Sequence, residues 1–341
     1  LRGEGYDGLI EEFYASAQEV FPKACVQLED FGNVNAFRLL RTYKERYCTF
    51  DDDIQGTGGV ALAGLYTALR ITGNRLHDHT FLFLGAGEAG IGIGDAIVTA
   101  LMEEGLSGSD ARRKCWYVDS KGLVVRSRGD LAEHKWPYAH DHAFLRDLPQ
   151  VVDAIRPTAI IGVSGTPRLL TRPVVEAMAR LNRRPILFAL SNPTSKAEGT
   201  AEEAYAWSDG RAVFASGSPF GPVTFRGETM VPGQCNNAYV FPGVGLGVVA
   251  TGASRVTDEM FFAAAKALAG LVTPADLAMG RIYPAPSRLR EISVAIAVAV
   301  AETVFARGLT AMTRPADLDG HIRSQMYDPG YPEYGPFYRP P

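Results

Sequence analysis

The sequence predicts an α/β protein, in which a doubly wound parallel sheet is flanked by a partial α/β region and by C-terminal helices. Three observations support this fold class. From residue 80 onward, short apolar runs alternate with stretches of helical periodicity. The runs are apolar throughout, which is typical of parallel strands covered on both faces. The 341 residues, 46% of them hydrophobic, are enough for about two domains and exclude a disordered chain.

The elements before residue 80 follow from the spacing of apolar residues. Residues 7–21 and 35–47 have the spacing of amphipathic helices, and the second of these helices is basic. Residues 26–28 form a short apolar run that predicts a strand. Residues 56–72 predict a more buried helix, because apolar and small residues occupy most of its positions.

The region after residue 80 predicts strands and helices in turn. The expected strands are residues 80–84, 115–118, 158–163, 186–190 and 212–214, and the expected helices are residues 88–104, 145–155 and 173–181. Beyond residue 217 the chain is rich in glycine and proline, and two more helices are expected at 256–271 and 286–307. The proline-rich and aromatic last fifteen residues predict an irregular tail, either loose or packed on a neighbouring subunit.

Charge and cysteine content exclude several classes of protein. The formal net charge is −4, so there is no electrostatic reason to expect binding to nucleic acid or to an anionic membrane. The four cysteines (Cys25, Cys48, Cys115 and Cys235) are widely spaced without a CxxC pair, which suits a reducing compartment and offers no zinc site. Apolar runs such as residues 292–301 are shorter than the ~18 residues of a spanning helix. We expect an intracellular protein.

A glycine-rich motif predicts a dinucleotide site of the Rossmann type. The expected strand ending at Leu84 is followed by Gly85, Ala86, Gly87, Glu88, Ala89 and Gly90, and then by a helix. In such a GxGxxG turn the first glycine permits the tight turn and the second lets the backbone approach a pyrophosphate. The third lets helix and strand pack closely. A purely structural turn is the alternative, but the strand–turn–helix context favours NAD(P).

The end of the next expected strand bears on the choice between NAD and NADP. Asp119 occupies the position whose carboxylate accepts hydrogen bonds from ribose hydroxyls, which by itself predicts NAD. However, a polar and basic stretch follows, and its cations would neutralise a 2′-phosphate; it comprises Ser120, Lys121, Arg126, Arg128 and Lys135. The sequence therefore favours NADP and leaves NAD possible. A solvated basic loop without a ligand is the alternative.

Two groups of acidic residues precede the glycine-rich motif. Glu29 and Asp30 follow the strand expected at 26–28, and Asp51, Asp52 and Asp53 precede the helix expected at 56–72. Two such loops could converge on Mg²⁺ or Mn²⁺, which prefer carboxylate and water oxygens. The alternative is that the second group only caps the following helix.

At these residues the sequence resembles the malic enzymes. The matching motifs occur in order along the chain at 27–33 (QLEDFGN), 35–37 (NAF), 50–57 (FDDDIQGT), 83–89 (FLGAGEA), 189–194 (ALSNPT), 214–220 (FASGSPF), 232–237 (PGQCNN) and 241–243 (FPG). Two positions depart from the family pattern. Asp51 stands where asparagine is usual, and Cys235 stands where glycine or alanine is usual.

The resemblance implies oxidative decarboxylation of (S)-malate to pyruvate and CO₂, with NADP or NAD as hydride acceptor and Mn²⁺ or Mg²⁺ as the metal. It implies Glu29, Asp30 and Asp53 as metal ligands and Asp52 as a neighbouring catalytic acid. Asn192, Asn236 and Asn237 match positions on the substrate and nicotinamide side of the site. The cofactor positions implied are Asn33, the six residues from Gly85 to Gly90 (Gly85, Ala86, Gly87, Glu88, Ala89 and Gly90), Asp119, Ser120, Lys121 and Lys135.

The general acid and base are not implied within this chain. In malic enzymes a tyrosine and a lysine serve as the general acid and base, and both lie in the part that precedes the matching segment. Neither Tyr6 nor Lys23 of this chain matches the motif of those two residues. Since residue 1 is leucine, we expect an N-terminally truncated chain. We expect it to be inactive alone, because the resemblance places the catalytic tyrosine and lysine upstream. A catalytically silent nucleotide-binding subunit of the same fold is the alternative. A further alternative is a different metal-dependent oxidative decarboxylase that acts on isocitrate or tartrate.

The resemblance also suggests a division of the chain. Residues 1–51 would end the N-terminal substrate domain, and residues 52–236 would form the NAD(P)-binding domain. Residues 237–310 would return as helices to the substrate domain, and residues 311–341 would form the tail. A homotetramer is the usual assembly of the family. The cytoplasm is the expected compartment, with mitochondria and plastids left open.

Overall fold

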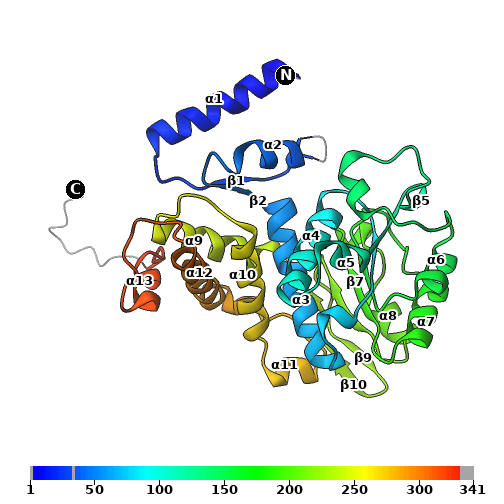
Figure 1. Ribbon diagram of the computed structural model, residues 1–341. Helices are drawn as coiled ribbons and strands as arrows, with labels where there is room; N and C mark the ends of the chain where they lie inside the picture. The colour runs from blue at the N-terminus through cyan, green and yellow to red at the C-terminus, as the bar shows by residue number, and fades with distance from the viewer. Residues whose placement is uncertain (1–2, 33–34, 331–341) are drawn as a thin grey trace.

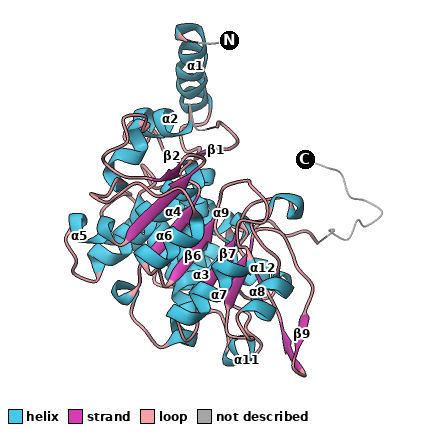
Figure 2. Cartoon of the chain, turned by 90° about the vertical axis from the view of Figure 1, so that its right-hand side faces the viewer, coloured by secondary structure: helices cyan, strands magenta, loops and turns pink. Residues whose placement is uncertain are grey.

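A seven-stranded sheet lies at the centre of the computed structural model, which describes residues 3–32 and 35–330 (Figures 1 and 2). Its strand order is β11-β8-β7-β6-β3-β4-β5. The strands are β3 (Phe81–Leu84), β4 (Cys115–Asp119), β5 (Gly122–Leu123), β6 (Ala159–Gly162), β7 (Ile186–Ala189), β8 (Val213–Ser216) and β11 (Gly233–Gln234). All neighbours are parallel except β4 and β5. The predicted fold class is confirmed.

The central strands are buried because helices cover both faces of the sheet. Phe81 and Phe83 of β3 point into one hydrophobic core, and Leu82 and Leu84 point into a second one on the other face. The first core includes α3 (Thr57–Thr72), α4 (Glu88–Glu103) and α10 (Asp258–Gly270); the second includes α6 (Leu148–Ile155), α7 (Arg172–Leu181) and α8 (Ala201–Trp207). This three-layer arrangement is the doubly wound one.

The order of the strands fixes where a ligand is expected. β3 lies between β4 and β6, so the chain runs outward from β3 in both directions across the sheet. In open α/β sheets the crevice at the carboxyl ends of the two diverging strands is the ligand site. The glycine-rich turn after Leu84 lies at this crevice, since it connects β3 to α4.

The N-terminal elements extend from this body. They are α1 (Glu4–Val20), β1 (Val26–Leu28), α2 (Ala36–Tyr43), β2 (Thr49–Asp51) and the π-helical turn η1 (Asp52–Gly56) that leads into α3. β1 and β2 form a parallel pair in which Val26 faces Thr49 and Leu28 faces Asp51. α1 projects away from the sheet in both views (Figures 1 and 2) and is anchored through buried Tyr14.

The C-terminal elements pack on both cores: the hairpin contributes Val223 to the second core, and two of the helices contribute to the first. These elements are the hairpin of β9 (Val223–Phe225) and β10 (Glu228–Met230), α9 (Phe241–Thr251), α11 (Pro274–Ala278), α12 (Leu289–Ala306) and α13 (Leu318–Ser324). α13 lies within the segment predicted as tail, and residues 331–341 lie outside the described residues. Within residues 3–32 and 35–330, no helix is long and apolar enough to cross a membrane.

Several helices differ from the prediction. The short helices α5 (Gly108–Arg113), α8, α11 and α13 were not predicted, and two further differences have a clear physical cause. The helix expected at 35–47 ends at Tyr43, because Tyr47 turns back to pack on Tyr14 before the chain enters β2. α9 was not predicted, since its glycines have low helix propensity. Glycine is needed at Gly243 and Gly247 because a Cβ at either position would lie within 2.9 Å of atoms of α12. The close packing of α9 on α12 therefore outweighs the low helix propensity of glycine.

Candidate active site

Two acidic loops meet where β1 and β2 end. Because the strands are parallel and adjacent, Glu29 and Asp30 leave β1 at the same edge at which Asp52 and Asp53 leave β2. The backbone N–H of Asp30, a residue with φ of 58°, donates to Oδ2 of Asp53 at 2.8 Å. The structure thus brings together the two groups that lie more than twenty residues apart in the sequence.

The run of three aspartates divides between two tasks. Asp51 caps η1, because its Oδ1 accepts the N–H of Ile54 at 3.1 Å. Asp52 is 1% exposed, and its Oδ1 has no hydrogen-bond partner. Gly56 packs so closely on Asp52 that a Cβ there would lie 1.8 Å from this oxygen. The capping alternative therefore applies to Asp51, whereas Asp52 and Asp53 face the site.

Burial and mutual repulsion oppose the ionisation of the acids in this cluster. Burial, together with the charges of the neighbouring Glu29, Asp53 and Asp51, raises the pKa of Asp52 to about 7, although a hydrogen bond from Asn237 opposes the shift. Burial likewise raises the pKa of Asp51 and of Glu88 to about 7, with Asp53 adding to both shifts. Acids whose ionisation is opposed in this way are expected where a cation binds.

A cavity of about 470 Å³ connects these acids to the cofactor turn and the asparagines. It is lined by Glu29, Asp52, Asp53, Thr57, Glu88, Ala89, Val163, Leu190, Ser191, Asn192, Cys235, Asn236, Asn237, Ala238 and Phe241. Asn237 donates from Nδ2 to Oδ2 of Asp52 at 2.9 Å and to the Thr57 hydroxyl at 2.9 Å. Asn236 caps the turn that follows by accepting the N–H of Ala238.

The predicted metal ligands share this region without forming a closed coordination shell. Within the part of the chain that the structure describes, no group of three acidic, histidine or cysteine side chains is arranged to hold a metal ion. Asp53 accepts the Asp30 N–H instead, and Glu29 accepts from the Gln27 amide at 2.8 Å. The charge and the orphaned oxygen of Asp52 fit a divalent cation, so the acids are suited to one after side-chain rotation.

Sequence reasoning missed the buried acid that shapes the Asn192 loop. Glu198 is fully buried and accepts from the Ser164 N–H at 2.8 Å and from the Ser191 hydroxyl at 2.5 Å. It thereby ties the loop after β6 to the loop after β7. Asn192 itself accepts from the Ser218 hydroxyl at 3.1 Å. An acid between Ala197 and Gly199, just after the quoted 189–194 motif, was the only signal in the sequence.

Cys235 does not behave as a reactive thiol. It is 7% exposed, and burial raises the pKa of its thiol to about 12. The thiolate is the reactive form of cysteine, so a thiol that stays protonated is unreactive. Cys235 is therefore best described as a small residue tolerated beside the asparagines.

The glycine-rich turn has the geometry that its sequence predicts. Gly85 has φ of 118°, and a Cβ there would lie 2.6 Å from the carbonyl oxygen of Val163 at the end of β6. A Cβ at Gly90 would lie 2.4 Å from the Gly85 carbonyl oxygen. Gly87 is the N-cap of α4 and Glu88 is its first residue, while Ala86 accepts from the His134 ring at 3.1 Å. The turn thus presents the N-terminus of α4 to the crevice.

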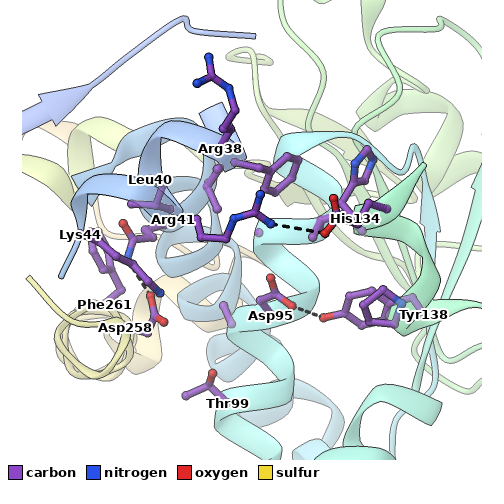
Figure 3. Close-up of a pocket in the computed structure, with 18 of the residues that line it drawn as sticks. Arg38, Leu40, Arg41, Lys44, Asp95, Thr99, His134, Tyr138, Asp258 and Phe261 are labelled. Carbon is purple, nitrogen blue, oxygen red and sulfur yellow. Dashed lines mark hydrogen bonds and ion pairs between the residues drawn. The ribbon is translucent and has the colours of Figure 1, made fainter. Parts of the chain in front are cut away.

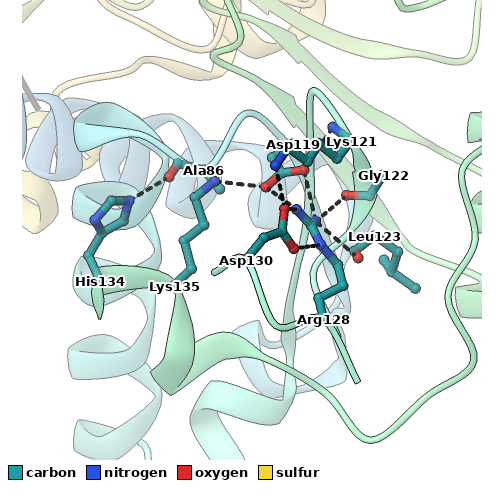
Figure 4. A network of polar contacts seen from close by, with 9 residues as sticks. All are labelled: Ala86, Asp119, Lys121, Gly122, Leu123, Arg128, Asp130, His134 and Lys135. Carbon is teal, nitrogen blue, oxygen red and sulfur yellow. Dashed lines mark hydrogen bonds and ion pairs between the residues drawn. The ribbon is translucent and has the colours of Figure 1, made fainter. Parts of the chain in front are cut away.

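A compact ion network surrounds Asp119 at the end of β4 (Figure 4). Arg128 donates to Oδ1 of Asp119 at 2.8 Å and to Oδ2 at 3.1 Å, and Lys135 donates to Oδ2 at 2.7 Å. The Lys121 N–H also donates to Oδ1 at 3.0 Å. Although burial opposes ionisation, the hydrogen bonds from Arg128 and Lys135 lower the pKa of Asp119 to about 2.

The solvated basic loop that was the alternative reading is wrong for Arg128. Its side chain is only 8% exposed and pairs with both Asp119 and Asp130. Lys121 pairs with Asp130 at 2.6 Å, and Arg126 donates to the Ala139 carbonyl. Ser120 lies exposed beside them. Asn33 lies outside the described residues, and Tyr6 and Lys23 do not line the acidic cavity.

A larger cavity, of about 960 Å³, lies between α2, α4, α10 and the segment Glu133–Tyr138 (Figure 3). None of the predicted site residues lines it. Several of its polar groups contact one another: Arg41 pairs with Glu133, Gln55 donates to Asp258, and Tyr138 donates to Asp95 at 2.5 Å. The predicted acids and asparagines line the smaller cavity, which we therefore take as the candidate active site.

The comparisons with known proteins agree with this geometry. Residues 54–305 match the family description "Malic enzyme, NAD binding domain", and residues 1–44 match "Malic enzyme, N-terminal domain". The chain belongs to the malic enzyme family. The NADP-dependent malic enzyme of Columba livia is 49% identical over 335 residues, which are 97% of this chain and 60% of that protein. The enzyme of the same name from Populus trichocarpa is 49% identical over 97% of this chain and 57% of its own length.

Solved structures of malic enzymes share the fold. The Entamoeba histolytica malic enzyme superposes with a TM-score of 0.74 at 23% identity, covering 92% of this chain and 63% of that one. The NAD-dependent malic enzyme of Thermotoga maritima has a TM-score of 0.67 at 25% identity, covering 85% of this chain and 70% of that one. The chain spans about 60% of the length of the curated malic enzymes that it matches.

Proposed function

We propose that this chain supplies the cofactor and metal part of an enzyme that oxidises (S)-malate with NADP and releases pyruvate and CO₂. The observation that carries the proposal is the single cavity that joins Glu29, Asp52 and Asp53 to three asparagines and to the first residues of α4. A divalent ion, a dicarboxylate and a nicotinamide must meet in one place for this reaction, and each has suitable side chains there.

Glu29, Asp30 and Asp53 are the proposed ligands of Mn²⁺ or Mg²⁺. When bound, the ion supplies Lewis-acid polarisation of the substrate C2 oxygen and stabilises the negative charge left by decarboxylation. Asp52, whose raised pKa allows it to exchange a proton near neutrality, lies beside these ligands and is fixed by Asn237. We propose that it adjusts the net charge of the acid cluster.

The asparagines suit the carboxylates of malate. Asn192 and Asn236 line the cavity, and their amide groups donate hydrogen bonds without adding charge. Asn237 uses its amide for Asp52 and Thr57, so we propose that it positions these two residues while Asn192 and Asn236 contact the substrate. Substrate alignment against the cofactor is then the main contribution of this wall.

The cofactor is proposed to be NADP, bound by its pyrophosphate at the turn from Gly85 to Gly90. Both carboxylate oxygens of Asp119 already accept hydrogen bonds, so they are poorly placed to accept a ribose hydroxyl. The network has one excess positive charge, because it contains three cations and two aspartates. The cations are Lys121, Arg128 and Lys135, and the aspartates are Asp119 and Asp130. An excess cation next to the ribose position favours a 2′-phosphate over a hydroxyl.

The described residues that line the cavity include no lysine or tyrosine. We therefore propose that the general base and acid come from the part of the relatives that this chain does not match, and that residues 52–236 form the cofactor domain of the complete enzyme. A homo-oligomer is also proposed. It would cover apolar side chains exposed on and after α1, which include Leu9, Phe13, Val20 and Phe21.

Malate-dependent formation of NADPH by a complete enzyme that includes this sequence tests the proposal. We expect activity with Mn²⁺ that is lost when the ion is chelated and is recovered when it is returned. NADP binding without turnover in that enzyme would instead support the catalytically silent subunit. Faster turnover of isocitrate or tartrate than of malate would support another oxidative decarboxylase.

A further inference from the structure

A polar cavity of about 380 Å³ lies at the edge of the sheet opposite the candidate active site. His79 and Thr158 precede β3 and β6, and the segment from Asn182 to Arg184 precedes β7, so the cavity lies at the amino ends of three adjacent strands. None of the residues proposed to contact malate, metal or NADP lines it. It is therefore independent of the proposed function.

One wall carries positive charge without a counter-charge. Neither Arg183 nor Arg184 forms an ion pair with a described carboxylate. Arg184 is half-buried and donates from Nε to the Arg211 carbonyl at 2.9 Å. Burial lowers the pKa of Arg184, and the nearby Arg183 and Arg211 lower it further. An anion at this wall would relieve an unfavourable cluster of cations.

His79 adds an unpaired hydrogen-bonding atom to the same cavity. Its ring is 2% exposed, and Nε2 has no hydrogen-bond partner among the described residues. Nδ1 lies 2.8 Å from the Thr158 hydroxyl. The Thr158 hydroxyl also lies 3.2 Å from the Thr80 carbonyl, which could accept its proton as well. Because that carbonyl already accepts the N–H groups of Thr158 and Ala159, we assign the hydroxyl proton to the nearer Nδ1. Nε2 then carries the ring proton and is a buried, unused donor.

The opposite wall offers acceptors. Residues 71–74 form the carboxyl end of α3, where the last carbonyl groups carry partial negative charge. Asn182 uses its Nδ2 for the carbonyls of Pro157 and Met178, which leaves Oδ1 as its remaining polar atom. Hydroxyl groups fit this wall, whereas a second anionic group does not.

We propose that this cavity binds a small phosphate monoester that carries hydroxyl groups. The phosphate lies against Arg183, Arg184 and His79, and the hydroxyl groups lie toward Asn182 and the end of α3. A volume of about 380 Å³ is several times that of a phosphate ion, so the cavity has room for a short polyol attached to it.

Calorimetric titration of the chain with glycerol 3-phosphate tests the proposal. We expect saturable binding that weakens at least about tenfold in the double variant Arg183→Gln/Arg184→Gln, since charge-assisted hydrogen bonds to phosphate are lost. Arg172→Gln, which alters an exposed arginine on nearby α7, is the matched control and should bind normally. Arg183→Gln alone serves if the double variant does not fold, because Arg183 is exposed.

Two further titrations locate the ligand. Lys135→Gln should leave glycerol 3-phosphate binding unchanged, and inorganic phosphate should bind more weakly than the ester. Loss of binding in Lys135→Gln would place the ligand at the cofactor site and overturn the proposal. So would the absence of saturable binding, equal affinity in the double variant, or equal affinity for inorganic phosphate.

Discussion

Two groups of acids in this protein have opposite electrostatic surroundings. Asp52 and its neighbours lie in a cavity without cations, and burial raises the pKa of Asp52 to about 7. Asp119 is also largely buried, yet Arg128 and Lys135 lower its pKa to about 2. The same residue type therefore titrates about five units apart, according to whether the protein supplies its counter-charge.

The difference separates a site that needs a ligand from one that is structurally complete. Asp52 has an oxygen without a hydrogen-bond partner among the described residues and is repelled by Glu29, Asp53 and Asp51, which a divalent cation would offset. The Asp119 network is satisfied internally and retains one excess positive charge, which suits an added phosphate. The predictions below test these two statements separately.

The largest effect is expected from Asp53→Ala in the complete enzyme. We expect Mn²⁺-dependent turnover to fall by at least about a thousandfold, because a metal ligand is lost, while NADP affinity changes only a few-fold. Steady-state kinetics measure both. Asp319→Ala, an exposed acid on α13, is the control and should be fully active. Near-normal turnover of Asp53→Ala would remove Asp53 from the proposed ligands.

The pH dependence of stability should differ between the two groups. The folded-state pKa of Asp52 lies above its ordinary value. The contribution of this side chain to the free energy of unfolding is therefore fully present below about pH 4 and is lost as the pH rises through 7. A pKa difference of about three units between the folded and unfolded chain corresponds to ~4 kcal/mol of the free energy of unfolding. The lowered pKa of Asp119 gives the reverse, namely stability lost as the pH falls from about 4 toward 2.

Denaturant unfolding of the metal-free chain measures this dependence. Asp52→Asn has no charge to bury, so we expect it to be more stable than the native sequence at pH 8 and similar to it at pH 4. If the difference in stability between Asp52→Asn and the native sequence were the same at pH 4 and at pH 8, Asp52 would be ionised and stabilised in the cavity.

Arg128→Met should destabilise the chain by about 3 kcal/mol, because it leaves Asp119 buried with one fewer cation. Urea unfolding measures the change. The matched variant Arg113→Met removes an exposed arginine whose ion pair with Asp110 is solvated, so it should change stability by less than about 0.5 kcal/mol. If both variants behaved alike, the network would not be the internally completed structure described above.

Lys135→Gln should have the smallest effect on the fold and a selective effect on the cofactor. We expect NADP affinity to fall about tenfold or more, and NAD affinity to change little, because only the former carries the 2′-phosphate. Fluorescence titration with each reduced cofactor compares them. An equal loss for both cofactors would assign Lys135 to the network alone.

The sequence predicted the parts of the fold that depend on local pattern. The alternation of apolar runs and helical stretches identified the five central strands of the sheet, and Gly85, Gly87 and Gly90 identified the tight turn between β3 and α4. α9 was missed because its glycines are justified only by their contact with α12, which is separated from it by many residues. Local propensity contains no information about such a contact.

The same limit applies to the site. Spacing could suggest that Glu29, Asp30 and Asp53 converge, since parallel strands end at a common edge, but it could not show that Asp51 caps η1 while Asp52 is buried beneath Gly56. Nor could it show that Arg128 is buried and neutralises Asp119. Both depend on which side chains meet across the chain. The roles of these residues in catalysis remain predictions.

Binding of Mn²⁺ to this chain tests the central claim most directly. Titration followed by the electron paramagnetic resonance of free Mn²⁺ compares the native sequence with Asp53→Asn, and with Asp130→Asn as the matched acid from the ion network. The account predicts one bound ion per native chain, an affinity reduced at least about tenfold in Asp53→Asn, and no reduction in Asp130→Asn. Equal Mn²⁺ binding by the native sequence and Asp53→Asn would contradict it.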